Sequence, residues 1–115
     1  MAKKEVYPKP EILPIYLQHL LSLPNVERKG ATMPYTSVHG HMFSFLDKEG
    51  NLALRLPEKE RIEFLNKYKT HLCMANGIVL KEYVVVPQKV FLELAVMKKY
   101  FRQSFDYVYS LPPKT

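Results

Sequence analysis

The sequence predicts an α+β fold, a two-layer sandwich in which helices pack on an antiparallel sheet. Three observations predict it: apolar residues follow a helical period in three segments, they follow a strand-like period in five, and short turns separate neighbouring strands. The resulting order is helix, three strands, helix, two strands, helix, which short uncrossed connections can join. At 115 residues, of which 47% are hydrophobic, the chain is sized for one core. We therefore expect a flexible basic arm at residues 1–9 and a single domain at residues 10–115.

The first helix is expected to begin near Leu13 and to end before Pro24. Pro14 fits the first helical turn, where its missing N–H is not needed. Pro24 stops the helix because proline cannot continue it. The apolar face expected of this helix consists of leucines at helical spacing, namely Leu13, Leu17, Leu20 and Leu21.

Three apolar runs follow, at residues 35–38, 42–46 and 52–56, and each predicts a strand. Turns at residues 39–40 and 47–50 join them, because the glycine in each turn adopts positive φ without strain. The third strand alternates leucine with Ala53 and Arg55. This alternation predicts one buried face and one face toward water.

The second half of the chain predicts a helix, a hairpin and a longer helix. Pro57 opens the first of these helices, whose apolar side is expected at Ile62, Phe64, Leu65 and Tyr68. Asn76 and Gly77 predict a two-residue hairpin between strands at residues 70–75 and 78–86, because both tolerate the positive φ of a type I′ turn. Residues 88–109 predict one long amphipathic helix. Its inward stripe is expected at Val90, Leu94, Met97, Phe101, Phe105 and Val108.

Four runs of the chain follow a pattern that occurs together in one protein family. They are residues 40–46 (GHMFSFL), 52–57 (LALRLP), 81–87 (KEYVVVP) and 110–114 (SLPPK). In order and spacing, the chain resembles the TfoX N-terminal domain family from about Thr32 to its end. The resemblance implies a helix-β-β-β-helix-β-β-helix arrangement similar to secretion-chaperone-like folds. It also implies a stand-alone, single-domain relative of regulators of natural competence, which act with a transcription activator.

The chain is basic, with 17 lysines and arginines against 11 acidic residues and a formal net charge of +6. Such a charge permits binding to nucleic acid without requiring it. The candidate anion contacts are the densest basic cluster, Lys98, Lys99 and Arg102, with Tyr100 and Tyr107 nearby to stack on bases. This pattern supports an alternative function, a nucleic-acid-associated accessory domain of a transcription or competence regulator. A solvated helix face is the favoured interpretation, because exposed lysines are routine.

Little in the sequence points to catalysis or to a bound metal. Two pairs, His39 with His41 and His71 with Cys73, have the residue types of a zinc site with three nitrogens and one sulfur. Turn histidines and a small buried thiol are favoured instead, because Cys73 lies in an apolar run. The chain has no nucleophile-elbow pattern and no glycine-rich phosphate loop. We therefore expect a protein that is not an enzyme and that holds no metal or cofactor.

Cysteine usage and hydropathy predict the compartment. The chain has one cysteine, which excludes an intramolecular disulfide and is typical of a reducing setting. No apolar run approaches the roughly 20 residues of a membrane span, and no signal-peptide pattern follows the basic start. We expect a cytoplasmic protein without membrane contact.

Two predicted strands are apolar on both faces, which three helices on one side of a sheet cannot cover. Because side chains alternate along a strand, the candidate interaction face is expected at Phe43, Phe45, Tyr83 and Val85. The alternative is the opposite face of the same strands, with Met42, Leu46, Val84 and Val86. Its cover is expected to be long side chains, a second copy of the chain, another partner, or Val6 and Tyr7 of the arm. The leading prediction is a non-enzymatic binding or regulatory module that acts through protein contacts, with a twofold homodimer as one form.

Overall fold

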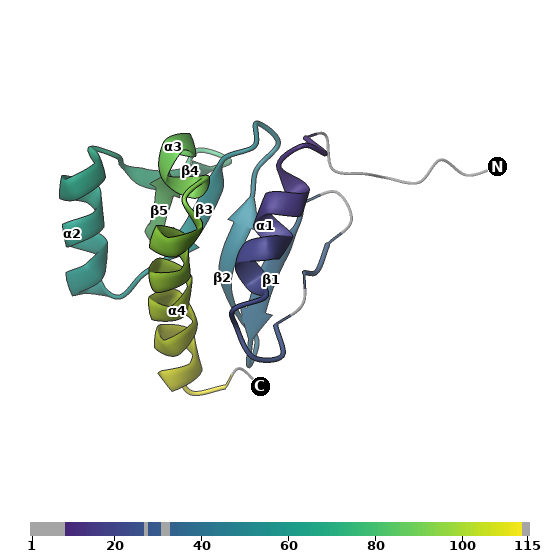
Figure 1. Ribbon diagram of the computed structural model, residues 1–115. Helices are drawn as coiled ribbons and strands as arrows, with labels where there is room; N and C mark the ends of the chain where they lie inside the picture. Colours follow the sequence, from purple (N-terminus) through teal and green to yellow (C-terminus); the bar gives the residue numbers. More distant parts are fainter. Residues whose placement is uncertain (1–8, 27, 31–32, 114–115) are drawn as a thin grey trace.

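A computed structural model describes residues 9–26, 28–30 and 33–113, and these form the predicted two-layer α+β fold (Figure 1). The basic arm predicted at residues 1–9 lies outside the described residues except for Lys9. The sheet is antiparallel, and its strand order is β1-β2-β3-β5-β4. The strands are β1 (Tyr35–Val38), β2 (His41–Leu46), β3 (Leu52–Arg55), β4 (Leu72–Ala75) and β5 (Ile78–Val86). The helices are α1 (Leu13–Leu20), α2 (Glu58–Tyr68), α3 (Gln88–Phe91) and α4 (Leu94–Ser110).

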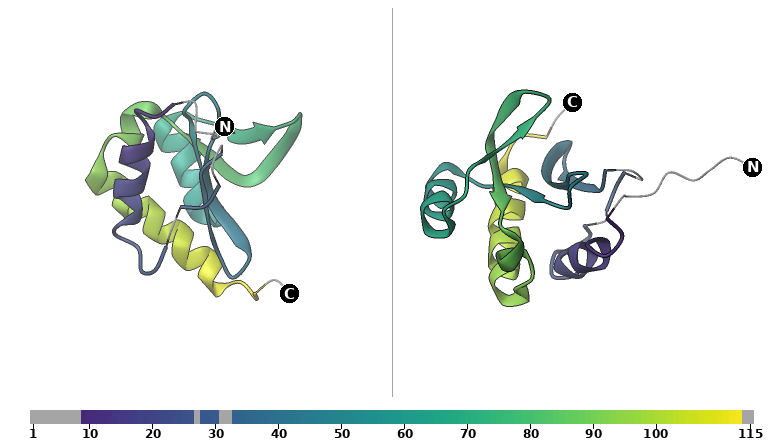
Figure 2. Two further views of the ribbon diagram at one scale, coloured as in Figure 1. Left: turned by 90° about the vertical axis from the view of Figure 1, so that its right-hand side faces the viewer. Right: turned by 90° about the horizontal axis from the view of Figure 1, so that it is seen from above.

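Helices α1, α2 and α4 lie side by side on one face of the sheet (Figures 1 and 2). The main core fills the space between them and the sheet, where Phe64 and Phe101 are fully buried. No helix in the described segments is long and apolar enough to cross a bilayer. We call this the helix-covered face and the other the open face.

A β-bulge in the β1–β2 ladder decides which way the phenylalanines of β2 point. Thr36 pairs with Ser44, but Ser37 pairs with Met42, so Phe43 has no partner residue. The extra residue shifts the alternation by one position. Phe43 therefore faces the helices together with Ser44, and its ring centroid lies 6.1 Å from that of Phe105.

Phe45 belongs to the opposite side of the sheet, where it packs with Ala53 and Cys73. Phe43 and Phe45 are thus on different faces, and the prediction that placed Phe43 on the interaction face is wrong. The physical reason is the bulge, because strict alternation would have put both rings on one side.

The β4–β5 hairpin has the predicted two-residue turn, and its pairing is antiparallel. Ala75 pairs with Ile78, and the intervening Asn76 and Gly77 have φ values of 52° and 77°. Farther from the turn, the pairing of β4 with β5 is irregular, because the single residue Cys73 lies opposite four residues of β5, 80–83. Such irregularities bend a strand sharply. Both views in Figure 2 show the hairpin rising from the sheet on the side away from the helices.

The single long helix predicted at residues 88–109 is interrupted. Glu93 is extended, with φ −94° and ψ 102°, and separates α3 from α4. The break lets Phe91 and Met97 both face the core, although they would lie on different sides of one continuous helix. It also leaves Leu94 45% exposed, whereas the remainder of the predicted stripe is buried.

Helix α1 buries a face that is rotated from the predicted one, and α2 departs from its prediction at one residue. In α1, Leu17 and Leu21 are exposed, while Tyr16 and His19 are buried. Hydrogen bonds explain this rotation, because the Tyr16 hydroxyl lies 2.7 Å from Ser44 Oγ and His19 Nε2 donates to the Phe91 carbonyl at 2.6 Å. In α2, Phe64 is buried and Leu65 and Tyr68 pack against the core as predicted, but Ile62 is exposed.

Candidate functional site

The open face of the sheet carries a small apolar group, which we call the open-face cluster. Its buried members are Phe45, Ala53 and Cys73, and its partly buried members are Tyr35, Met42, Leu80, Tyr83 and Val85. Three of the four residues of the predicted interaction face therefore come together here. Sequence alternation missed Cys73 and Leu80, because only the bend in the hairpin carries them over this face.

Side chains of the chain itself cover much of this cluster. The Tyr83 ring lies 5.8 Å from that of Phe45, and its hydroxyl donates a 2.6 Å hydrogen bond to the Met42 carbonyl. Phe45 is only 9% exposed as a result. Of the covers expected from the sequence, long side chains fill this role in the described chain. Val6 and Tyr7 lie outside the described residues.

The apolar surface that stays open lies farther out, at the end of the hairpin. Met74, Ile78 and Val79 are 64%, 65% and 44% exposed, and we call these three residues the hairpin tip. A signal for the tip exists in the sequence: the predicted strand at residues 78–86 is longer than its neighbour at 52–56. The surplus length has to project beyond the sheet.

Strand β4 is also an edge of the sheet. Among the described strands it has no neighbour on its outer side. Its four residues, LCMA, include no charge and no proline. Proteins commonly protect exposed edges with charges, prolines or a covering segment. An unprotected edge beside an apolar tip is a surface suited to strand addition.

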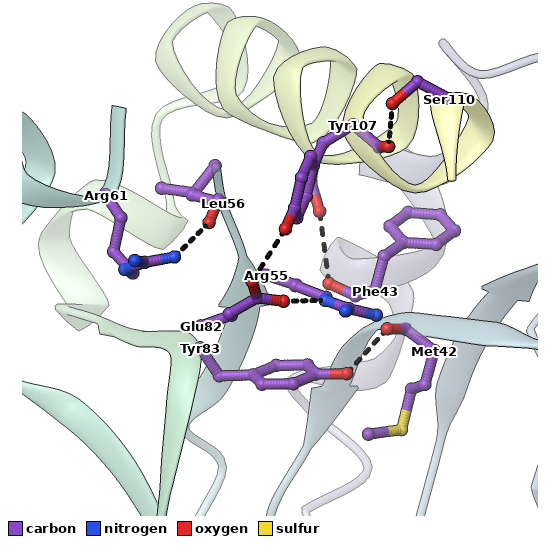
Figure 3. A network of polar contacts seen from close by, with 10 residues as sticks. Met42, Phe43, Arg55, Leu56, Arg61, Glu82, Tyr83, Tyr107 and Ser110 are labelled. Atoms are coloured by element: carbon purple, nitrogen blue, oxygen red, sulfur yellow. Dashed lines mark hydrogen bonds and ion pairs between the residues drawn. The ribbon is translucent and has the colours of Figure 1, made fainter. Parts of the chain in front are cut away.

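A polar network joins the two faces of the sheet (Figure 3). Arg55 Nε donates to Glu82 at 2.7 Å, and the Tyr107 hydroxyl donates to the other oxygen of the same carboxylate at 2.7 Å. The guanidinium lies between two rings, 5.9 Å from the centroid of Tyr83 and 5.6 Å from that of Tyr107. Arg55, expected on a water-facing side, is thus held between α4 and β5.

The network fixes the protonation of its members. Burial raises the pKa of the Glu82 carboxyl, but hydrogen bonds from Tyr107 and Arg55 and the Arg55 charge outweigh it, so that this pKa is lowered. Burial and the hydrogen bond to Glu82 raise the pKa of Tyr107. A carboxylate engaged by two donors serves to position α4 rather than to exchange protons.

The candidate anion contacts border different hollows around α4. Lys98 lines a hollow beside α1, and Lys99 lies 5.3 Å from the ring centroid of Tyr100 beside α2. Arg102 pairs with Asp106 at 3.1 Å. Tyr100 is buried, and the Tyr107 hydroxyl is bonded to Glu82. Neither ring is therefore placed to stack on a base.

The histidines and the cysteine weighed as zinc ligands are far apart in the sheet. His39 and His41 lie at the β1–β2 turn, whereas Cys73 lies on β4, with β3 and β5 between. Over the part of the chain that the structure describes, no three His, Cys, Asp or Glu side chains are grouped to hold a metal ion. Burial, with a contribution from the Asp47 charge, raises the pKa of the Cys73 thiol. A thiol of this kind is a poor nucleophile at neutral pH.

Comparisons with known proteins identify no relative of the chain. No model of a protein family matches the chain, and neither the curated proteins nor the solved structures contain a significant match.

Proposed function

We propose that the chain is a non-enzymatic, cytoplasmic binding or regulatory module that contacts a partner protein by strand addition at β4. The observation that carries this proposal is the projecting hairpin, whose tip exposes Met74, Ile78 and Val79 beside an unprotected edge. Main-chain hydrogen bonds at such an edge supply affinity, and the apolar side chains supply specificity. The single buried thiol suits a reducing compartment.

A protein partner suits this surface better than a polyanion does. The hairpin tip carries no charge, whereas neutralising the phosphates of a nucleic acid depends on lysine and arginine. Exposed apolar side chains are stabilised by contact with other apolar groups, at about 1.5–3 kcal/mol for each large one that is fully buried. Association entropy opposes this gain by several kcal/mol, so we expect weak to moderate affinity. The partner needs to offer an extended apolar strand.

The first partner to test is a second copy of the chain. Two β4 edges can pair antiparallel about a twofold axis, which extends the sheet across both molecules. Sedimentation equilibrium at increasing concentration measures such pairing. We expect Ile78→Lys to weaken it strongly, because a charge would enter the contact. The matched control is Ile62→Lys, which changes an equally apolar residue that is 52% exposed on α2.

If the chain stays monomeric well above micromolar concentration, the homodimer form is wrong and a different protein has to supply the strand. Co-purification from the native host with the same two variants then tests the module itself. A protein held by wild type and Ile62→Lys but lost with Ile78→Lys supports the proposal. Equal retention by all three variants contradicts it.

The alternative, a nucleic-acid-associated accessory domain, rests on the net charge of +6 and on exposed Lys98, Lys99 and Arg102. A titration with duplex and single-stranded DNA at two salt concentrations tests it. Binding at low salt that weakens steeply with added salt would favour this alternative over the protein-binding module.

We also infer a distant relationship to the TfoX N-terminal domain family. It is supported by the element order, in which α1, three strands, α2, two strands and a final helical pair follow one another. It is further supported by a contact between two of the family-like runs, because Arg55 of residues 52–57 binds Glu82 of residues 81–87. A regulatory role in natural competence stays a proposal on this basis.

A further inference from the structure

A further hollow of the described surface lies far from the hairpin tip. It is a cleft of about 610 Å³ between the C-terminal half of α4, the β1–β2 turn and the segment after α1. Figure 1 shows this end of α4, in yellow, beside the lower ends of β1 and β2. The strand order puts β1 and β4 at opposite edges of the sheet. The cleft is therefore independent of the surface proposed for strand addition.

One wall of the cleft is built of aromatic rings that contact one another at tilted angles. The ring centroid of Tyr109 lies 5.7 Å from that of Phe105, and the His39 ring lies 4.9 Å from Tyr109. His39 reaches this place because the β1–β2 turn holds it at a positive φ of 53°. Phe105 is almost fully buried, whereas Tyr109 is 57% exposed. This wall offers flat apolar surface to a planar ring.

The cleft also carries polar groups with unused hydrogen-bonding capacity, among them Arg102, whose guanidinium carbon lies 5.6 Å from the ring centroid of Phe105. Arg102 uses Nε for Asp106, at 3.1 and 3.3 Å to its two oxygens. The two terminal amino groups of its guanidinium have no partner among the described residues. Asn25 lines the same cleft, and within the described chain its side-chain amide has no hydrogen-bond partner. Donors are therefore available to an incoming acceptor.

The charge of the cleft is weakly positive. Asp106 offsets much of the Arg102 charge, because the two form an ion pair. Lys29 adds a second positive charge nearby, since its Nζ donates at 2.9 Å to Ser37, which lines the cleft. A single negative charge on a ligand matches this balance better than two, because a dianion would also face Asp106. Two coplanar oxygens fit the paired amino groups of a guanidinium.

We propose that this cleft binds a small aromatic carboxylate, with its ring against the exposed Tyr109 and its carboxylate on Arg102. The volume is in the range of small-molecule sites, which combine apolar walls with a few convergent polar groups. The proposal goes beyond strand addition and does not depend on it.

Benzoate is the probe, and nitrogen-15 NMR of the full chain gives the readout residue by residue. We expect saturable shifts at the amides of residues 37–39 and 102–110, with a Kd on the order of 1 mM for so small a ligand. Benzylamine keeps the ring but reverses the charge, and it should bind roughly tenfold more weakly or not at all. Cyclohexanecarboxylate keeps the charge but lacks the flat ring, and it should also bind more weakly.

Two pairs of variants separate site binding from general attraction to a basic protein. Arg102→Gln should weaken benzoate binding roughly tenfold, whereas Lys99→Gln, which removes the same charge from the other side of α4, should leave it within about twofold. Tyr109→Ala should weaken binding and Tyr109→Phe should preserve it. The three residues changed, Lys99, Arg102 and Tyr109, are exposed helix positions, so that the fold is retained.

The proposal is overturned by any of three results. The first is the absence of saturable shifts up to about 20 mM benzoate, well above the expected Kd. The second is equal weakening by Arg102→Gln and Lys99→Gln, which would indicate charge attraction alone. The third is a set of shifts centred on the hairpin tip instead of the cleft.

Discussion

The helix-covered face and the open face of the sheet bury apolar side chains by different means. On the helix-covered face, other elements supply the cover, and Phe43, Phe64 and Phe101 are completely buried. On the open face, the sheet supplies its own cover, because β5 is long enough to bend back and bring Leu80 and Tyr83 over Phe45. A sheet with apolar residues on both sides therefore does not require a second helical layer. As a consequence, the apolar side chains that remain exposed on this side lie at the hairpin tip.

Phe43 and Phe45 provide the sharpest test of this difference, because they are the same residue type two positions apart on β2. Phe43→Ala should lower the free energy of unfolding by about 3–5 kcal/mol, since it leaves a cavity in a core closed on all sides. Phe45→Ala should lower it by about 1–3 kcal/mol, because Tyr83 and Met42 can settle into the space or water can enter. Urea unfolding measures both quantities.

Phe101→Ala is the control, because Phe101 is buried on the helix-covered face but belongs to another element, α4. It should lower the free energy of unfolding by about as much as Phe43→Ala does. If instead Phe45→Ala costs as much as Phe43→Ala, the open-face cluster is as well enclosed as the main core. The distinction between the two faces would then not hold.

As the pH falls, the protein should first lose stability through His19, which is buried on the helix-covered face. Burial lowers the pKa of its imidazole below 6.5, against the opposing effect of the hydrogen bond to Phe91, and Nδ1 is buried with no hydrogen-bond partner among the described residues. Above pH 6.5 the ring is neutral in both folded and unfolded chains. Below it, the unfolded chain takes up a proton that the folded chain refuses, so the free energy of unfolding falls.

Unfolding experiments on the wild type should give a lower free energy of unfolding at pH 5 than at pH 7. This decrease should be smaller than the one caused by Phe45→Ala. His19→Gln, whose amide can still donate to Phe91, should show little change between the two pH values. His71→Gln, at an exposed position, should behave like wild type. A wild-type stability that does not change between pH 7 and pH 5 would contradict the assignment to His19.

The network of Arg55, Glu82 and Tyr107 should change the free energy of unfolding over a lower pH range than His19 does. Its contribution should also be smaller. Glu82→Gln should lower the free energy of unfolding at pH 7 by about 1 kcal/mol, because its side chain is 34% exposed and the ion pair is partly screened. The Glu82 pKa is lowered from 4.5, so the stabilisation is complete above that pH and is lost as the pH falls through the folded value.

The difference in stability between wild type and Glu82→Gln should therefore shrink below pH 4.5. Tyr107→Phe removes one hydrogen bond and leaves the ion pair with Arg55, so its effect at pH 7 should be smaller. A Glu82→Gln difference that stays constant from pH 7 to pH 3 would mean that the charge of Glu82 adds nothing to the fold.

Local sequence determined which elements form and where most of them end. The hairpin at Asn76 and Gly77 follows from two residues that accept positive φ, and α2 begins after Pro57 as predicted. The α+β class and the antiparallel pairing follow from apolar periods and short turns, which act between residues near in sequence. On the candidate site, alternation correctly grouped Phe45 with Tyr83 and Val85.

Only the tertiary structure decided which way individual side chains face. One extra residue opposite β1 reversed the direction of Phe43, and a bulge depends on pairing between strands rather than on either strand alone. The rotation of α1 is set by hydrogen bonds from Tyr16 and His19 to residues 28 and 72 positions away. The cleft beside Arg102 likewise gathers three distant segments. Periodicity reports the preference of one segment for water or core, whereas these features arise from partners that only the folded chain brings together.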